Sequence, residues 1–139
     1  MLQDCPWDSF RQSKLEFCEE VLCAWIKQPG NTWSGVGFIL VGLWIWRRAR
    51  ASQHASLRVV GVASILMGLG SAFYHASGTW IGMLADYTGM FMGSSLMVAL
   101  NLRRWLGWRC GALLGVFLAL TTLFLASTVL FPGTERWVF

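Results

Sequence analysis

Two long stretches of this sequence contain no charged residue. One lies between Arg58 and Asp86, and the other lies between Arg109 and Glu135. Each is longer than the roughly 20 residues that an α-helix needs to cross about 30 Å of hydrocarbon. Only 13% of all residues are charged, which is about half the share found in soluble domains. A chain of 139 residues cannot enclose so much apolar surface in a core of its own, so the sequence indicates an integral membrane protein.

Apolar segments separated by short polar loops predict an all-α fold, a polytopic transmembrane bundle of about four spanning helices. An N-terminal segment, residues 1–30, precedes the bundle, which occupies residues 31–139. The predicted helices cover residues 31–46, 57–75, 81–102 and 110–131.

The N-terminal segment has mixed charge and lacks the apolar run of a cleavable signal peptide. Five apolar residues within it predict a short amphipathic helix on the membrane surface, which ends before Pro29-Gly30. These residues are Leu15, Val21, Leu22, Trp25 and Ile26. Asn31-Thr32 is then the expected cap of the first spanning helix, because a polar side chain stands just before an apolar run.

The positions of the arginines predict the orientation in the membrane. They gather in two loops at helix ends, with Arg47, Arg48, Arg50 and Arg58 in one loop and Arg103, Arg104 and Arg109 in the other. Cytoplasmic loops are enriched in Lys and Arg. We therefore expect the N-terminus and the loop 76–80 on the non-cytoplasmic face, in a bacterial inner membrane or in the endoplasmic reticulum. This placement accounts for the net charge of +4, and we expect no nucleic-acid partner.

The cysteines have no metal-binding spacing. Cys5, Cys18 and Cys23 lie in the N-terminal segment, where a non-cytoplasmic location permits a disulfide, but the sequence does not select a pair. Cys110 begins the last predicted helix, where we expect it to act as a small apolar residue.

Three polar residues inside the membrane segments predict a site. Ionisable groups cost about 2.5–3.5 kcal/mol at the centre of a spanning helix, so they usually have a function. His75 ends the second helix, Asp86 lies near the start of the third, and Ser71 lies one turn before His75 on the same face. An imidazole suits zinc, a carboxylate can deprotonate water, and a hydroxyl can donate to an oxyanion. The alternative interpretation is a local hydrogen-bond cluster with a structural role and no catalytic role.

Glycines recur at spacings that predict close packing between helices, because small residues let helix backbones approach each other. They are Gly61, Gly68 and Gly70 in the second helix, the pair Gly89/Gly93 in the third, and the series Gly107/Gly111/Gly115.

The stretch GLGSAFYHASGTWIGMLADYTGM resembles the alkaline ceramidase family of the CREST superfamily. That family has a Ser, a His four positions later at the end of its second helix, and an Asp eleven positions after the His, as Ser71, His75 and Asp86 stand here. A second match lies upstream, in Phe17-Cys18-Glu19-Glu20 and Asn31-Thr32-Trp33-Ser34. Together the two matches span most of residues 17–90.

The resemblance implies the N-terminal part of a seven-helix fold related to the progestin and adipoQ receptors. It also implies a zinc-dependent hydrolase of lipid amide bonds, with the bilayer and a lipid amide substrate as partners. His75 would be one of three zinc-binding histidines, Asp86 would assist the zinc-bound water, and Ser71 would support the oxyanion or the water.

The resemblance also implies calcium, which some members bind through acidic residues before the first helix. Glu19 matches that pattern. Val21, however, stands where the family has an Asn, and Gln28 stands where an acidic residue is expected. The calcium site is therefore expected to be weak in this chain.

A larger departure concerns zinc, because the family takes its other two histidines from an HxxxH pair on its last helix. The only other histidine here is His54, in a predicted cytoplasmic loop on the order of 30 Å from His75. A catalytic zinc needs about three protein ligands. We therefore expect an incomplete site, in a truncated product or in one chain of a split enzyme completed by a second chain or another copy. The ending Trp137-Val138-Phe139 is typical of a helix start or of an amphipathic tail.

Two other classes stay open at this point. One is a non-catalytic small membrane protein that assembles through its glycine-rich helix faces. The other is half of a transporter with Asp86 as its ion-coupling group, although no helix has a mid-membrane proline to interrupt it. Metal binding discriminates the hydrolase from both.

Overall fold

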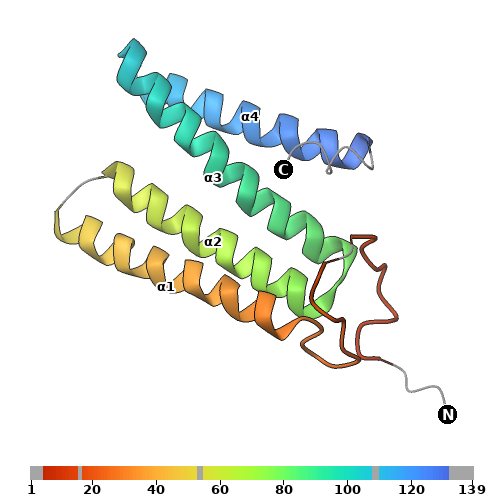
Figure 1. The fold of residues 1–139 in the computed structure, drawn as a ribbon. Helices are drawn as coiled ribbons and strands as arrows, with labels where there is room; N and C mark the ends of the chain where they lie inside the picture. The colour runs from red at the N-terminus through yellow and green to blue at the C-terminus, as the bar shows by residue number, and fades with distance from the viewer. Residues whose placement is uncertain (1–4, 16, 53–54, 108–109, 132–139) are drawn as a thin grey trace. The chain divides into compact units, whose positions relative to one another are not determined.

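A computed structural model describes residues 5–15, 17–52, 55–107 and 110–131. These residues form an all-helical fold, as the sequence predicted (Figure 1). Its helices are α1 (Pro29–Ala51), α2 (Ala55–Ser77), α3 (Trp80–Leu106) and α4 (Cys110–Leu130). Both His54 and the C-terminal residues 132–139 lie outside the described part of the chain, so the expectations for them stay predictions.

The helices α1 and α3 continue further than predicted, because their terminal arginines are helical. Arginine is a good helix former, and in α1 the guanidinium of Arg50 lies 4.9 Å from the centroid of the Trp46 ring. The end of α3 is set by Gly107, whose φ of 63° is left-handed and whose N–H donates to the carbonyl of Arg103. This is a common glycine ending of a helix.

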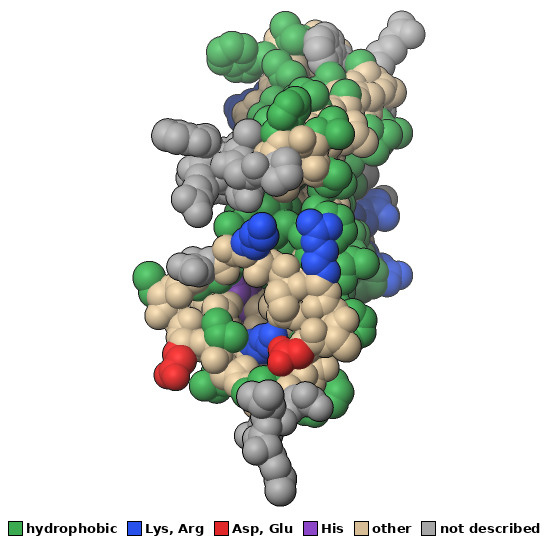
Figure 2. Space-filling model, turned by 90° about the vertical axis from the view of Figure 1, so that its right-hand side faces the viewer, with side chains coloured by type: hydrophobic (Ala, Val, Ile, Leu, Met, Phe, Trp, Pro, Cys, Tyr) green, Lys and Arg blue, Asp and Glu red, His purple; other side chains and the backbone are tan. Residues whose placement is uncertain are grey.

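Three of the helices are long and apolar enough to cross a membrane, over Ser56–Ser77, Trp80–Leu106 and Gly111–Leu130. With 23 residues, α1 has a similar length, but its polar first turn and terminal arginines make it less apolar, and it is not among the three. Large apolar side chains are exposed on all four helices, as at Phe38, Leu69, Val98 and Leu123. Figure 2 shows hydrophobic side chains on the face that it draws. The fold is consistent with a multi-pass membrane protein.

By its internal contacts the chain divides into two compact units, Met1–Gly89 and Met90–Phe139. The first unit contains α1, α2 and the start of α3. The second contains the rest of α3 and α4, and within it the rings of Phe91 and Phe124 stack with centroids 5.4 Å apart. Every residue of the candidate site lies in the first unit.

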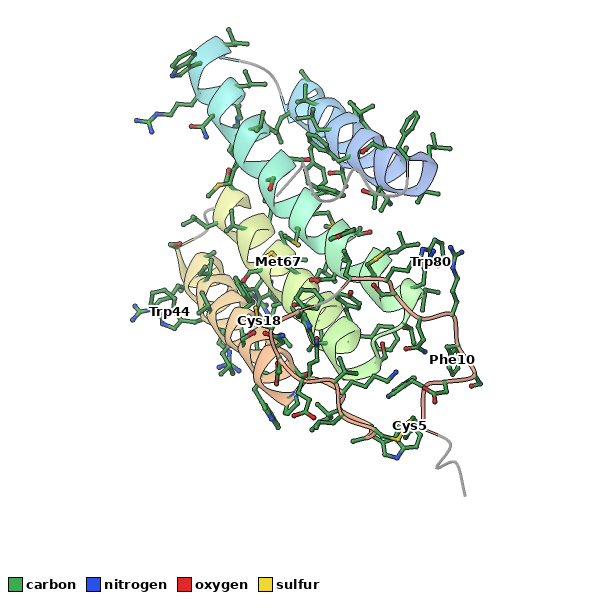
Figure 3. All side chains as sticks on the ribbon, turned by 45° about the vertical axis from the view of Figure 1, so that its right-hand side comes forward. Cys5, Phe10, Cys18, Trp44, Met67 and Trp80 are labelled. Atoms are coloured by element: carbon green, nitrogen blue, oxygen red, sulfur yellow. A yellow bond between two sulfur atoms is a disulfide. The ribbon has the colours of Figure 1, made fainter. Side chains whose placement is uncertain are left out.

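Glycines bring the helices of the first unit together, as predicted for Gly61, Gly68, Gly70 and Gly89. The prediction is wrong for the series Gly107/Gly111/Gly115, where an added Cβ would meet no described atom within 4 Å. Between α1 and α2, a Cβ atom at Gly68 would lie 2.6 Å from the carbonyl oxygen of Gly35. Between α2 and α3, a Cβ at Gly89 would lie 2.6 Å from the Cα of Met67, a residue labelled on α2 in Figure 3. Since no side chain fits at these positions, the backbones are in direct contact.

The N-terminal segment differs from the prediction. Its described residues, 5–15 and 17–28, form turns and bends and contain no helix, so the predicted amphipathic helix is wrong. A disulfide joins Cys5 to Cys23 (Figure 3), while Cys18 is exposed and not disulfide-bonded. The segment is instead held by contacts with residues far along the chain, which a local pattern of apolar residues does not reveal.

Its main partner is the loop between α2 and α3. Gln12 and Thr79 form an antiparallel bridge. On either side, the N–H of Ser13 donates to the carbonyl of Gly78 at 3.0 Å, and the N–H of Trp80 donates to the carbonyl of Arg11 at 2.7 Å. The N-terminal segment therefore lies against the end of the unit where α2 turns into α3 (Figure 1).

The α1–α2 contact predicts opposite effects of alanine at two glycines of α1. A Cβ at Gly42 would lie 2.7 Å from the Gly61 carbonyl, whereas a Cβ at Gly37 meets no described atom within 4 Å. We expect Gly42→Ala to lower the unfolding free energy by about 1–3 kcal/mol through overpacking. Gly37→Ala should be neutral or stabilising by up to about 1 kcal/mol, because alanine favours helix. Thermal unfolding in detergent measures both, and equal destabilisation would contradict the packing.

Candidate functional site

The end of α2 is capped by the residues that lead into α1. The last carbonyl groups of a helix have no partner within it. Here the N–H of Lys27 donates to the carbonyl of Ala76 at 2.9 Å, and the N–H of Gln28 donates to the carbonyl of His75 at 3.1 Å. The N–H of Gly78 donates to a third carbonyl of this last turn, that of Tyr74. These bonds place residue 28 directly beside residue 75.

The side chains of Gln28 and His75 meet at the same point. The Oε1 atom of Gln28 lies 2.7 Å from Nδ1 of the imidazole, and both residues are buried, with 6% and 9% of their surface exposed. The amide nitrogen of Gln28 faces the backbone carbonyl of Glu19 at 3.5 Å. Gln28 was singled out from the sequence only as a departure from the calcium pattern, and its contact with His75 was missed.

Ser71 and Asp86 also come together, from α2 and α3. The Ser71 hydroxyl lies close enough to the Asp86 carboxyl group to interact with it. The approach is close because α2 has a glycine there, and a Cβ at Gly70 would lie 3.2 Å from the backbone nitrogen of Asp86. Asp86 is 7% exposed. The predicted antiparallel neighbours therefore hold a hydroxyl close to a buried carboxyl.

His75 lies beside this pair along α2, one helical turn after Ser71. Its ring packs edge-on against Phe17, with centroids 4.9 Å apart, and lies tilted beside the Tyr74 ring at 5.1 Å. The Tyr74 hydroxyl in turn hydrogen-bonds Ser13 at 2.8 Å. Residues of the N-terminal segment thus cover the imidazole, while its hydrogen-bond partner is Gln28 and not Asp86 or Ser71.

The carboxylate of Glu19 is bound to the backbone of α1 and is not placed as a metal ligand. Its Oε1 accepts a hydrogen bond from the N–H of Gly30 at 2.6 Å, and its Oε2 accepts one from Asn31 at 2.8 Å. The carboxylate therefore caps the first turn of α1, where a negative charge is favourable. The expected cap at Asn31-Thr32 is wrong, because both residues lie inside the helix.

Lys27 is a buried cation that the sequence patterns did not identify. Its Nζ donates to Oε1 of Gln12 at 2.7 Å and lies 3.8 Å from the exposed carboxylate of Asp8. Its stem packs beside Gly78, where a Cβ would lie 3.1 Å from Cδ of the lysine. These contacts tie the N-terminal segment to the loop after α2.

The described residues fit zinc better than calcium. For calcium they do not fit, because both oxygens of Glu19 already accept backbone hydrogen bonds and the side-chain oxygen of Gln28 faces His75. For zinc, His75 supplies one imidazole whose Nδ1 is bonded, as in many zinc sites. Among residues 5–15, 17–52, 55–107 and 110–131, no group of three or more His, Cys, Asp and Glu side chains gathers.

The fold and the site define a class, a multi-pass helical membrane protein with a buried aspartate and a buried histidine beside a serine at one end of its first unit. A sequence profile of the ceramidase family matches residues 10–136. The chain therefore belongs to the ceramidase family. Searches among curated proteins and among solved structures each gave no match.

The role of Glu19 predicts how the protein responds to substitution and to calcium. Glu19→Ala should lower the unfolding free energy by about 0.5–2 kcal/mol, because α1 loses its cap. The exposed neighbour Glu20 provides a matched control, Glu20→Ala, which should have little effect. We expect added calcium to leave the melting temperature of the unaltered chain unchanged. A calcium-dependent stabilisation that Glu19→Ala abolishes would contradict the capping role.

Proposed function

We propose that this chain takes part in the zinc-dependent hydrolysis of a lipid amide bond inside the membrane. The proposal is supported by membership of the ceramidase family and by one observation of the site. This observation is the burial of a carboxyl and an imidazole, those of Asp86 and His75, at one end of α2 and α3, with the Ser71 hydroxyl beside them.

Zinc, when bound, would supply a Lewis acid that polarises the amide carbonyl and makes water a nucleophile at neutral pH. His75 would be one of its ligands. These 139 residues hold only one further histidine, His54, so we propose that an HxxxH pair from outside them completes the site.

The remaining residues have distinct roles in this proposal. The Asp86 carboxylate would accept a proton from the attacking water, and general bases of this kind contribute about 10²–10⁴-fold to the rate. The Ser71 hydroxyl would interact with Asp86 and help to orient it, or would donate to the carbonyl oxygen as negative charge develops on it. Water and the lipid amide would then give a fatty acid and a free amine.

The Cys5–Cys23 disulfide supports a non-cytoplasmic N-terminus, because disulfides persist in oxidising compartments. Arg48 and Arg50 lie at the opposite end of α1, as expected if that end faces the cytoplasm. The site would then lie near the non-cytoplasmic surface.

Zinc content and hydrolysis test the proposed reaction. We expect the purified chain in nanodiscs to bind stoichiometric zinc and to hydrolyse a short-chain ceramide only when a transmembrane chain bearing HxxxH is present. His75→Ala should abolish zinc binding, measured by metal mass spectrometry. Asp86→Asn should keep the zinc and lose at least about 100-fold in rate. An isolated chain with stoichiometric zinc and full activity would contradict the incomplete site, and His75→Ala with both properties intact would refute the proposal.

Thiol labelling tests the orientation. In a Cys110→Ser background, a membrane-impermeant maleimide should label the exposed Cys18 from the non-cytoplasmic side of intact cells. With Cys18→Ser and Ser52→Cys combined, labelling should need permeabilised membranes, because Ser52 follows the arginines of α1. The reverse pattern would contradict the proposed orientation.

A further inference from the structure

Gln28 differs from the other polar residues of the site because its own polar groups have partners on several sides. Its backbone N–H donates to the His75 carbonyl. Its backbone carbonyl accepts hydrogen bonds from the Thr32 N–H at 2.9 Å and from the Thr32 hydroxyl at 2.7 Å. Its side chain bridges His75 and the carbonyl of Glu19. A residue held in this way has little freedom to turn its side chain.

These partners determine which way the amide of Gln28 faces. The backbone carbonyl of Glu19 can only accept a hydrogen bond, so the NH₂ group of Gln28 must face it. The side-chain oxygen then faces Nδ1 of His75, at 2.7 Å. The opposite orientation would place two oxygens against each other at the Glu19 carbonyl.

The orientation of the amide in turn determines the tautomer of His75. An amide oxygen can only accept, so Nδ1 must carry the proton and donate it. In a neutral imidazole the other nitrogen, Nε2, then keeps its lone pair. A lone pair on Nε2 is what a metal or an acidic proton needs from this ring.

We propose that Gln28 is the positioning residue for His75, holding the imidazole with its proton on Nδ1 and leaving Nε2 as the atom that meets the ligand. The use of Nε2 for zinc rests on the proposed function, whereas the tautomer itself does not. Gln28 touches neither a metal nor a substrate in this proposal. It acts through His75, as groups that orient metal-binding histidines do.

The test reads the tautomer without metal. The full chain carries ¹⁵N-labelled histidine and the substitution His54→Gln, so that only His75 gives a signal, and the ¹⁵N shifts of the ring in nanodiscs distinguish the two tautomers. We expect the Nδ1–H form. Gln28→Met, which removes the acceptor at similar size, should give a mixture of forms or the Nε2–H form. Gln28→Glu, which keeps an acceptor oxygen beside Nδ1, should keep a proton on Nδ1.

Thr32→Val is the matched control, because it removes a hydrogen bond to the backbone of Gln28 and leaves the amide side chain unchanged. It should keep the Nδ1–H form. An Nε2–H form in the unaltered chain, or a tautomer unchanged by Gln28→Met, would overturn the proposal.

A second measurement separates this inference from the proposed function. In the complex completed by an HxxxH chain, Gln28→Met should weaken zinc binding by about 10–100-fold, and Gln28→Glu should recover it. Unchanged zinc affinity in Gln28→Met would overturn the positioning role. If no variant of the completed complex binds zinc while the Nδ1–H form is observed, the proposed function fails and the tautomer assignment stands.

Discussion

The hydrogen bonds between residues 27–28 and the last turn of α2 are the constraint on which the rest of the site depends. A helix that ends inside a membrane protein leaves carbonyl groups that water does not reach, and each must find a donor. Here the donors are the N–H groups of Lys27 and Gln28. The same two bonds bring the start of α1 to the end of α2, and they place the side chain of Gln28 against His75.

The arrangement of the site lowers the free-energy cost of burying polar groups in an apolar environment. A buried carboxyl or imidazole without a partner is expensive. The polar partner of Asp86 is the hydroxyl of Ser71, and the hydrogen-bond partner of His75 is the amide oxygen of Gln28. His75 and Asp86 therefore have different partners and do not hydrogen-bond to each other. Each keeps a part of its hydrogen-bonding capacity for a substrate, a water or a metal.

The helices and the Ser71–Asp86 contact could be predicted from the sequence. Long uncharged segments determine spanning helices, and a short loop makes α2 and α3 antiparallel neighbours. The Gln28–His75 contact could not be predicted in this way, because the two residues lie 47 positions apart and nothing in the local pattern links them. The predicted amphipathic helix failed for a related reason. Residues 5–28 make their bonds with the α2–α3 loop, with a disulfide and with the end of α2, so local apolar spacing was misleading.

We propose that His75 presents Nε2, and not Nδ1, to a zinc ion beside Ser71 and Asp86. Crystals of the zinc-loaded complex, measured above and below the zinc absorption edge, locate the metal directly. The account predicts an anomalous peak about 2.0–2.1 Å from Nε2 of His75, with Oε1 of Gln28 still bonded to Nδ1. A peak on Nδ1, or zinc bound at a place remote from His75, would contradict it.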